Sequence, residues 1–287
     1  MKAPPFSHVA PRSLDEALRV LHEADNARVL AGGQSLVAML NMRFAMPDLL
    51  VDIGHISELA HITDQGDAIA IGAMTRQREV EFSPLVAQRL PLLKEAIGHV
   101  GHRQTRNRGT VGGSLCQLDP SAEIPTVAMA MDATITAASV RGRREIPMSH
   151  FPAGYMTPSL EPDEMLVSVS IAPWARGHGH AFEEYARRHG DFAIVSAAVL
   201  ISLDAQGVVD RVSITLGGVS VMPVRVKAAE QLLLGSRAQA ADLAAAAACC
   251  KAVEATSDSH VQGWYRQHLA QVLCGRALKR ALNRVER

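Results

Sequence analysis

The sequence has few cysteines, few aromatic residues and no excess of charge of either sign. Its 287 residues include four cysteines, and none stands in the C-x-x-C arrangement that holds zinc or an iron–sulfur cluster. We therefore expect any redox metal to belong to another chain. Lysine plus arginine and aspartate plus glutamate each number 29, so the formal net charge is zero. That balance argues against a nucleic-acid partner, because binding to a phosphate backbone depends on clustered positive charge.

Long hydrophobic runs are missing as well. No stretch without charged residues reaches the roughly 18 residues needed to cross a bilayer. The first residues carry a lysine and two prolines instead of the apolar segment of a secretory signal. We expect a cytoplasmic protein with no transmembrane segment. Hydrophobic residues make up 48% of the chain, enough for a sizeable core. The length is about twice the ~150 residues typical of one domain, which suggests two domains.

Several common catalytic motifs are absent. The chain has no G-x-x-x-x-G-K-[ST], no G-x-G-x-x-G after a strand, no H-E-x-x-H and no G-x-S-x-G. These absences remove support for nucleotide kinases, ordinary Rossmann dehydrogenases and serine hydrolases.

The first half of the chain is typical of small alternating α and β units. Ser13 and Glu16 form a capping-box pattern ahead of a helix of about three turns. Thr75 is expected to cap a helix that runs to about residue 81, and Pro91 suits the first turn of another helix. The remaining predicted elements are strands at 27–31, 49–52 and 68–72 and a helix at 35–42.

The pattern of predicted elements changes near residue 175, from mixed helices and strands to successive strands followed by helices. Residues 101–113 are predicted to be a basic, glycine-rich loop, followed by strands at 133–140 and 166–171 and a linker at 173–180. Three strands then succeed one another without a long helix, which favours an antiparallel sheet. Those strands are predicted at 181–186, 194–203 and 212–216. The last ~60 residues are expected to be mostly helical.

Two glycine pairs are the strongest candidates for a binding site. They lie in Ala31-Gly32-Gly33-Gln34-Ser35 and Thr110-Val111-Gly112-Gly113-Ser114, 80 residues apart. A glycine pair after a strand can take positive φ and bring amide hydrogens together around an anion. Neighbouring hydroxyl and amide side chains can complete such a nest, so two of them could grip the two phosphates of a dinucleotide. Each pair alone is better explained as a tight turn. When both pairs are considered together, a phosphate-binding site and two tight turns explain them equally well.

These segments also resemble a known family. The carriers are the two glycine segments, Arg106-Asn107-Arg108-Gly109 before the second of them, Asp119-Pro120-Ser121-Ala122-Glu123-Ile124-Pro125, Gly190-Asp191-Phe192-Ala193 and a helical end that begins at Tyr265-Arg266. In order and spacing they resemble the FAD-binding medium subunit of the molybdenum hydroxylases, of the carbon monoxide dehydrogenase medium-chain type. The resemblance spans nearly the whole chain, although each motif alone is weak.

The resemblance implies an α+β fold in two domains. Residues 1–175 would form an FAD-binding domain of the vanillyl-alcohol-oxidase (PCMH) type, with two small α/β lobes at about 1–58 and 59–175. Residues 176–287 would form a C-terminal domain with a three-stranded antiparallel sheet and helices. The composition change near residue 175 agrees with this division.

The resemblance also implies a set of cofactor contacts. Leu30 to Leu36 (Leu30, Ala31, Gly32, Gly33, Gln34, Ser35, Leu36) and Thr110 to Ser114 (Thr110, Val111, Gly112, Gly113, Ser114) would hold the FAD pyrophosphate. Glu123 would accept from the ribose hydroxyls as an ionised carboxylate, the alternative being a solvated acid at a helix start. Gln117, where the family usually has Asn or His, can still donate to ribose or phosphate.

Two further contacts concern the rings of the cofactor. Leu166 would pack on the adenine, the alternative being an ordinary strand-core leucine. Arg187, Asp191 and Phe192 match the loop beside the isoalloxazine, where a cation would stabilise reduced flavin and Phe192 could cover a ring face. The alternative is an exposed basic turn. The roles of Arg103, Arg106 and Arg108 stay open between phosphate and a partner subunit.

The function implied is electron transfer in a larger complex. The chain would bind FAD noncovalently and have no catalytic acid, base or metal ligand of its own. Electrons would come from a molybdenum-pterin large subunit through the [2Fe-2S] clusters of a small subunit, in a dimer of heterotrimers. The alternatives are a stand-alone flavin reductase of the same superfamily and a flavin-free scaffold subunit. The sequence selects neither the substrate nor the electron acceptor.

Overall fold

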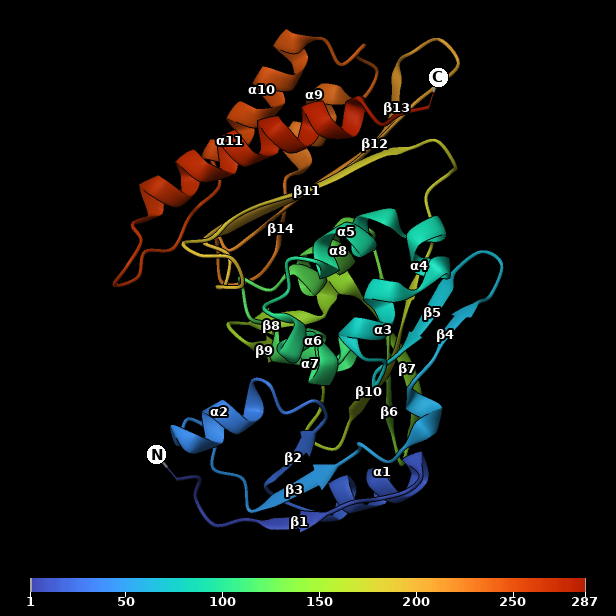
Figure 1. The fold of residues 1–287 in the computed structure, drawn as a ribbon, viewed down its shortest axis with the longest axis vertical. Coiled ribbons are helices and arrows are strands. Elements are labelled where there is room, and N and C mark those ends of the chain that lie inside the picture. Colours follow the sequence, from blue (N-terminus) through green and yellow to red (C-terminus); the bar gives the residue numbers. More distant parts are fainter. Residues whose placement is uncertain (1, 287) are drawn as a thin grey trace.

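The computed structural model describes residues 2–286 and contains three β-sheets that follow one another along the chain. In Figure 1 the N-terminal sheet lies at the bottom, a five-stranded sheet in the middle and the C-terminal sheet with its helices at the top. A two-stranded ribbon, β8 (Pro152–Gly154) with β9 (Thr157–Pro158), completes the strands. None of the helices within these residues combines the length and apolar character that a membrane crossing requires.

The N-terminal lobe is a small parallel sheet with the order β1-β3-β2. Its strands are β1 (Ser7–Val9), β2 (Ala27–Leu30) and β3 (Leu49–Asp52), and its helices are α1 (Leu14–Glu23) and α2 (Leu36–Asn41). The buried residues of α1 are Leu14, Ala17, Leu18 and Leu21, the spacing of one helix face. Because β2 and β3 are parallel, their carboxyl ends meet at one edge, where the first glycine segment begins.

The middle lobe is an antiparallel sheet with the order β4-β5-β10-β6-β7. The strands are β4 (Ile62–Asp64), β5 (Ile69–Gly72), β6 (Thr134–Ser139), β7 (Gly142–Pro147) and β10 (Met165–Ile171). Its helices are α3 (Gln77–Phe82), α4 (Pro84–Arg89), α5 (Pro91–Ile97), α6 (Arg103–Arg108), α7 (Val111–Gln117) and α8 (Glu123–Ala130), with 3-10 turns at Ser57–Leu59 and Met148–His150. Prolines at the first positions of α4 and α5 lose no helical hydrogen bond there.

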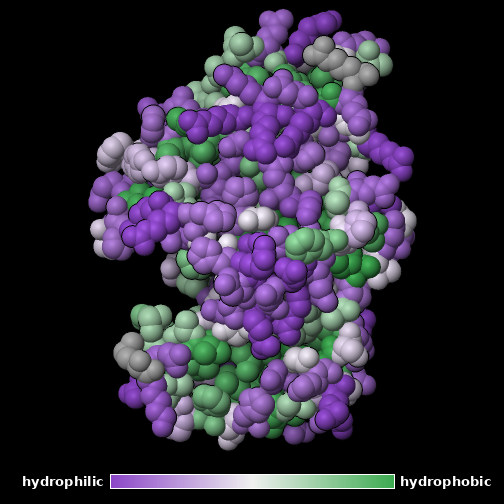
Figure 2. Space-filling model, viewed as in Figure 1, coloured by the Kyte–Doolittle hydropathy of each residue, from purple (hydrophilic) through white to green (hydrophobic). Residues whose placement is uncertain are grey.

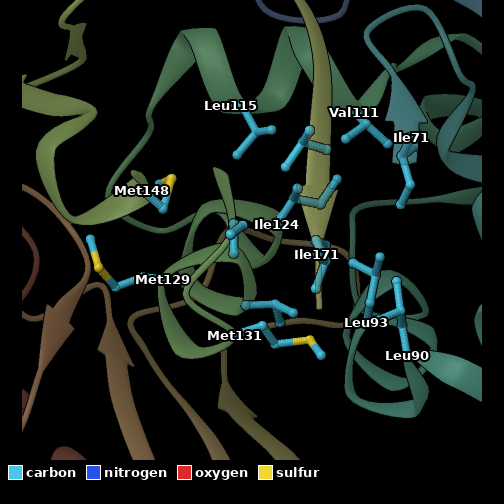
Figure 3. Packing of buried hydrophobic residues seen from close by; sticks show 14 of the residues in the cluster. Ile71, Leu90, Leu93, Val111, Leu115, Ile124, Met129, Met131, Met148 and Ile171 are labelled. Atoms are coloured by element: carbon cyan, nitrogen blue, oxygen red, sulfur yellow. The ribbon is translucent and has the colours of Figure 1, made fainter. Parts of the chain in front are cut away.

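The core of the middle lobe forms between this sheet and its helices. Figure 3 shows Ile71 and Ile171 from the sheet facing Val111 and Leu115 of α7 and Leu93 of α5. The cluster continues into the C-terminal sheet through Phe182, Ala198 and Leu200. The middle lobe and the C-terminal sheet are therefore packed together through apolar side chains.

The C-terminal part is an antiparallel sheet covered by three helices. The strands are β11 (Gly179–Tyr185), β12 (Val195–Leu203), β13 (Val209–Gly217) and the two-residue β14 (Val224–Arg225). The helices are α9 (Lys227–Leu233), α10 (Ala240–Lys251) and α11 (Gly263–Leu282). Alternate residues of β12 face opposite cores: Val199 packs under these helices, whereas Leu200 faces the middle lobe. Both faces of this sheet are buried.

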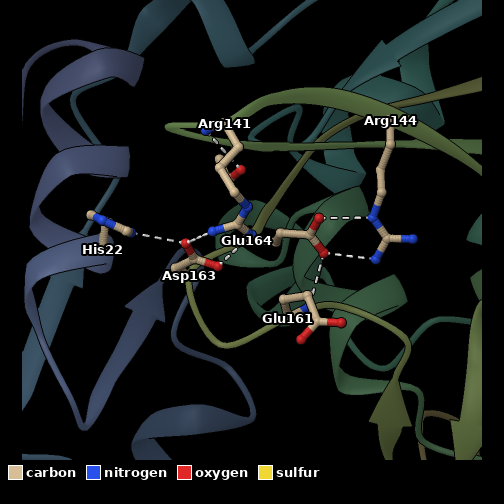
Figure 4. Close-up of polar contacts among 7 residues, drawn as sticks. His22, Arg141, Arg144, Glu161, Asp163 and Glu164 are labelled. Carbon is tan, nitrogen blue, oxygen red and sulfur yellow. Dashed lines mark hydrogen bonds and ion pairs between the residues drawn. The ribbon is translucent and has the colours of Figure 1, made fainter.

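Charged side chains tie the N-terminal lobe to the middle lobe. Figure 4 shows Asp163 between His22 of α1 and Arg141 at the β6–β7 turn. Next to it, Glu164 accepts two hydrogen bonds of 2.7 Å from Arg144 of β7. The arginines hold the pKa values of both carboxyl groups below their usual range.

The fold class predicted from the sequence is confirmed: the chain is a mixed α/β structure that ends in an antiparallel sheet and helices. The C-terminal sheet has a fourth strand, the two-residue β14, in addition to the three that were predicted. Two further local predictions are wrong. Residues 101–113 are not one loop, because they contain α6 and the first turn of α7. Thr75 does not cap α3, since its hydroxyl donates to the His61 carbonyl at 2.8 Å and Arg76 takes the cap position.

Candidate functional site

The two glycine segments, 80 residues apart in sequence, lie in contact. Gly32 packs so closely on the Arg108 carbonyl that a Cβ atom there would overlap it. A Cβ atom on Gly113 would lie 3.9 Å from that of Ala31. Arg76 and Thr110 also pair as an isolated antiparallel bridge beside this contact. The segments therefore have the proximity that two halves of one site require.

The first segment presents backbone donors that the protein does not use. Within residues 2–286, the amides of residues 32–36 donate no hydrogen bond to a backbone or side-chain acceptor. Gly33 takes φ +73°, a conformation that side chains rarely adopt. Buried or half-buried amides without partners are costly, so this segment fits an anionic ligand that accepts from it.

The second segment has already used its amides. Val111 donates to the Thr75 carbonyl at 3.1 Å, Gly112 to the Ala73 carbonyl at 2.9 Å, and Gly113 to the Thr110 hydroxyl oxygen at 3.0 Å. A nest of free amides, expected here from the glycine pair, does not form, because the chain starts α7 and bonds to the segment after β5. Its remaining donors are side chains: the hydroxyl group of the half-buried Ser114 and that of Thr110, which is 2% exposed.

Two arginines stand beside the first segment. The Arg76 guanidinium donates to the Arg108 carbonyl, the group against which Gly32 packs. Burial and, next, the positive charge of Arg108 lower the pKa of Arg76 below its ordinary value. Two guanidinium groups this close repel each other unless an anion lies between them. Sequence reasoning did not single out Arg76, because nothing distinguishes it from any arginine at a helix start.

An indentation separates the N-terminal lobe from the rest of the molecule. In the view of Figure 2 it opens at the left, between the part that carries α2 and the part that carries α6 and α7. Gln117 at the end of α7 reaches Met39 of α2, with its side-chain nitrogen 3.4 Å from the sulfur. Gln117 therefore lies where the N-terminal and middle lobes meet.

The predicted isoalloxazine loop lies at the N-terminal end of α6, whereas the first glycine segment lies at its C-terminal end. Arg187, Asp191 and Phe192 belong to the β11–β12 loop, and the Phe192 side chain is 66% exposed. The loop rests on His102, the residue before α6, because Gly190 has no room for a Cβ atom against that ring. The six residues of α6 span about 9 Å. A ligand that reached from Gly32 to Phe192 would run alongside this helix.

Glu123 and Leu166 are more deeply packed than expected. Glu123, at the start of α8, is 5% exposed, and burial followed by the charge of Glu184 raises its pKa to about 8. Its burial does not fit a solvated acid, and the raised pKa favours the protonated form near neutral pH over the ionised acceptor expected from the resemblance. Leu166 of β10 is 2% exposed within the core cluster, so its side chain contacts protein.

The three arginines left open by the sequence differ in their surroundings. Arg106 is structural: its guanidinium donates to both carboxylate oxygens of Glu81, at 2.9 and 3.1 Å, and to the Val100 carbonyl at 3.0 Å. Arg103 and Arg108 are exposed. Only Arg108 adjoins a glycine segment.

The residues that commonly carry redox chemistry are not assembled here. Burial raises the pKa of the Cys116 thiol to about 12, so this cysteine is an inert packing residue. All four cysteines are free thiols. Among the described residues, no three histidine, cysteine or acidic side chains are grouped so that they could hold a metal ion.

Two family descriptions match consecutive parts of the chain. Residues 4–174 match the FAD binding domain in molybdopterin dehydrogenase, and residues 180–281 match the CO dehydrogenase flavoprotein C-terminal domain. Together they cover almost the entire sequence.

Individual relatives are similar over their whole length. The chain is 41% identical over 286 residues to the 6-hydroxypseudooxynicotine dehydrogenase complex subunit alpha of Paenarthrobacter nicotinovorans, covering 99% of this chain and 97% of that protein. It is 35% identical to the carbon monoxide dehydrogenase medium chain of Hydrogenophaga pseudoflava, covering 99% and 98%.

Solved structures agree with these relatives. A chain of the carbon monoxide dehydrogenase from Hydrogenophaga pseudoflava superposes with a TM-score of 0.97 at 36% identity, over 100% of both chains. A chain of quinoline 2-oxidoreductase from Pseudomonas putida 86 gives 0.94 at 36% identity, over 99% of both.

Proposed function

The chain belongs to the FAD-binding subunits of the molybdenum-containing hydroxylases and dehydrogenases, and we propose that it holds FAD between its lobes and relays electrons through it. Electrons would enter from iron–sulfur clusters of a partner subunit and leave to an external acceptor. Bound FAD supplies the two-electron chemistry. The residues of this chain bind the cofactor, orient it and adjust its potential.

The observation that carries the proposal is the set of unpartnered amides at residues 32–36. A diphosphate has the negative charge and the acceptor oxygens that these donors lack, and Arg76 and Arg108 add positive charge beside them. We propose that the second glycine segment binds the diphosphate through side chains, whereas the first binds it through backbone amides. Thr110 and Ser114 would donate through hydroxyl groups, and Gln117 through its amide.

The flavin ring is assigned to the far end of α6. Phe192, which is largely exposed, is available to cover a ring face, and Arg187 to offset negative charge on the reduced ring. For Glu123 we propose a hydrogen-bond donor role toward the ribityl or ribose hydroxyls, because burial keeps it protonated near neutral pH. Leu166 would form the wall of the adenine site on the side that faces the protein core.

The names of the relatives support a proposal for the partners and the location. One relative is named a complex subunit and another a medium chain. We propose a molybdenum-pterin large subunit and a [2Fe-2S] small subunit as partners, in a dimer of heterotrimers, and a division of this chain into domains at residue 175. The four free thiols fit the cytoplasm, where disulfides are rare.

One set of measurements separates the candidate functions. The purified chain should show a flavin spectrum whose chromophore is released by acid and has the mass of FAD. A colourless chain that cannot be loaded with FAD would identify a scaffold. Substrate turnover by the isolated chain would identify a stand-alone reductase. Copurification with an iron–sulfur and a molybdenum subunit, without such turnover, supports the proposal.

A further inference from the structure

Two buried glutamates face each other where the middle lobe meets the C-terminal sheet. Glu123 is the first residue of α8 and is 5% exposed. The side chain of Glu184, in β11, is 7% exposed. Glu184 lies close enough for its charge to act on Glu123. No cofactor role was predicted for Glu184, which follows Glu183 in a strand and gives no signal of burial in the sequence.

The surroundings of the pair leave it without a strong counter-charge. Within residues 2–286, one carboxylate oxygen of Glu184 has no hydrogen-bond partner. Its other oxygen lies 3.9 Å from Nδ1 of His99, whose side chain is 39% exposed. Asp119, on the segment before α8, is the remaining titratable group that acts on Glu123. The partly exposed His99 ring therefore lies beside the pair, too far for a direct hydrogen bond but near enough for a bridging water.

Burial and proximity determine how the pair titrates. Desolvation, and then the charge of Glu184, raise the pKa of Glu123 to about 8. Desolvation raises the pKa of Glu184 to about 7. Two interacting carboxyl groups release their protons in steps that belong to the pair. The number of protons on this pair therefore changes near neutral pH, where ordinary carboxylates are fully ionised.

The position of the pair relates it to the cofactor. Glu123 follows α7 within one short segment, and Glu184 is three residues before Arg187 in the predicted isoalloxazine loop. The geometry points to a proton-exchanging site: we propose that the Glu123–Glu184 pair takes up a proton from solvent through His99 when FAD is reduced. The inference rests on the proposed function.

The charges in this step balance. Bound FAD would accept two electrons with one proton and would thereby gain one negative charge. One further proton from water then converts a carboxylate of the pair to a carboxylic acid, and that proton returns to water on reoxidation. The bond between this proton and a carboxylate oxygen is the one bond in the protein that forms and breaks. The pair would thus offset the negative charge of the ring. Glu184 would act through its charge alone, without contact with the reacting atoms.

The first test uses the protein without FAD. Infrared spectra of the wild-type apoprotein at pH 6 should contain a protonated-carboxyl band that disappears by about pH 9 and is missing from the Glu123→Gln/Glu184→Gln double variant. The control is Glu183→Gln, which changes the neighbouring residue of β11, a partner of Arg280 at 2.9 Å. Identical spectra for the wild type and the double variant would overturn the pair as a proton site.

The second test counts protons in the FAD-loaded protein. At pH 8, a dye should report more than one proton taken up per two-electron reduction in the wild type and in Glu183→Gln, and fewer in Glu184→Gln, in which Glu123 is the one remaining carboxyl group of the pair. Equal uptake in all three would overturn the inference even if FAD binds normally. Failure to load FAD would instead overturn the proposed function, and with it the coupling, whatever the infrared band shows.

Discussion

The two glycine segments share a sequence signature but differ in how they use it. Residues 30–36 leave the edge of a parallel sheet with a run of amides that have no acceptor in the described chain. Residues 110–123 turn inward, where the amides of Val111 and Gly112 bond to neighbouring backbone and Glu123 is buried. The first segment is arranged for a ligand, whereas the second is arranged mainly for the fold.

The comparison shows what a glycine pair indicates. A glycine permits close approach of backbone, and the approaching group is another part of the protein as readily as a ligand. Gly112 illustrates this, since a Cβ atom there would lie 2.7 Å from the Cβ atom of Ala73. Gly33 is needed instead for its positive φ. Substitutions at these two positions should therefore have different consequences.

The largest expected effect is on FAD binding by the first segment. Gly33→Val places a β-branched residue at φ +73° and should redirect the free amides. We expect at least a 100-fold increase in the Kd for FAD, which corresponds to about 2.7 kcal/mol. Titration of apoprotein, followed by quenching of flavin fluorescence, measures it.

Gly207→Val is the matched control for this variant. Gly207 has φ +75° and no atom within 4 Å of the Cβ position, and it lies in the β12–β13 turn. The backbone strain should be similar, so the free energy of unfolding should fall alike in both variants, but the control should keep its FAD. Equal FAD affinity in the two proteins would remove the first segment from the binding site.

The next effect is on stability through the second segment. Gly112→Ala introduces a methyl group against Ala73, where both the side chain and the backbone are within 2.8 Å of it. Overpacking of this kind costs about 1–3 kcal/mol. Thermal and urea unfolding of the apoprotein should show this loss. If Gly112→Ala instead leaves stability unchanged and weakens FAD binding, the two segments do not differ as described.

Much of the fold could be predicted because local patterns and tertiary packing agree. The strand at 49–52 and the helix that begins at Leu14 occur as predicted, since apolar spacing and capping point to the same structure. The charged strand β7 was missed, because its sequence Gly-Arg-Arg-Glu-Ile-Pro has no apolar alternation. It forms as an edge strand paired with β6.

The sites were harder to predict than the fold. The glycine pairs are visible in the sequence, which does not reveal the amides that the fold itself uses, since these depend on Ala73 and Thr75 lying opposite them. It placed Glu123 in a family motif but not beside Glu184, which comes from another sheet. Both outcomes depend on contacts between residues distant in sequence.

The buried Glu123, nine residues beyond the second segment, should also make stability depend on pH. The folded-state pKa of Glu123, about 8, exceeds the ordinary value of 4.5, so the folded protein binds more protons between these values. Stability should therefore fall as pH rises from about 5 to 8, by at most about 1.4 kcal/mol per pH unit from this group. Tm measured across this range should fall in the wild-type apoprotein and vary less in Glu123→Gln. A Tm that varies equally in both would contradict burial of this carboxyl group.

The smallest effect concerns Thr110, which belongs to the second segment but is assigned a contact to the cofactor. Its hydroxyl oxygen accepts from the Gly113 amide at 3.0 Å and caps α7. Thr110→Ala should cost about 1 kcal/mol of stability through the lost cap, whereas Thr110→Ser keeps the oxygen and should cost less. If the hydroxyl hydrogen also binds a phosphate, FAD affinity should fall in the alanine variant and recover in the serine variant, yet remain well above that of Gly33→Val. A stability loss with unchanged FAD affinity would make the second segment structural throughout and assign diphosphate binding to residues 30–36 and their arginines.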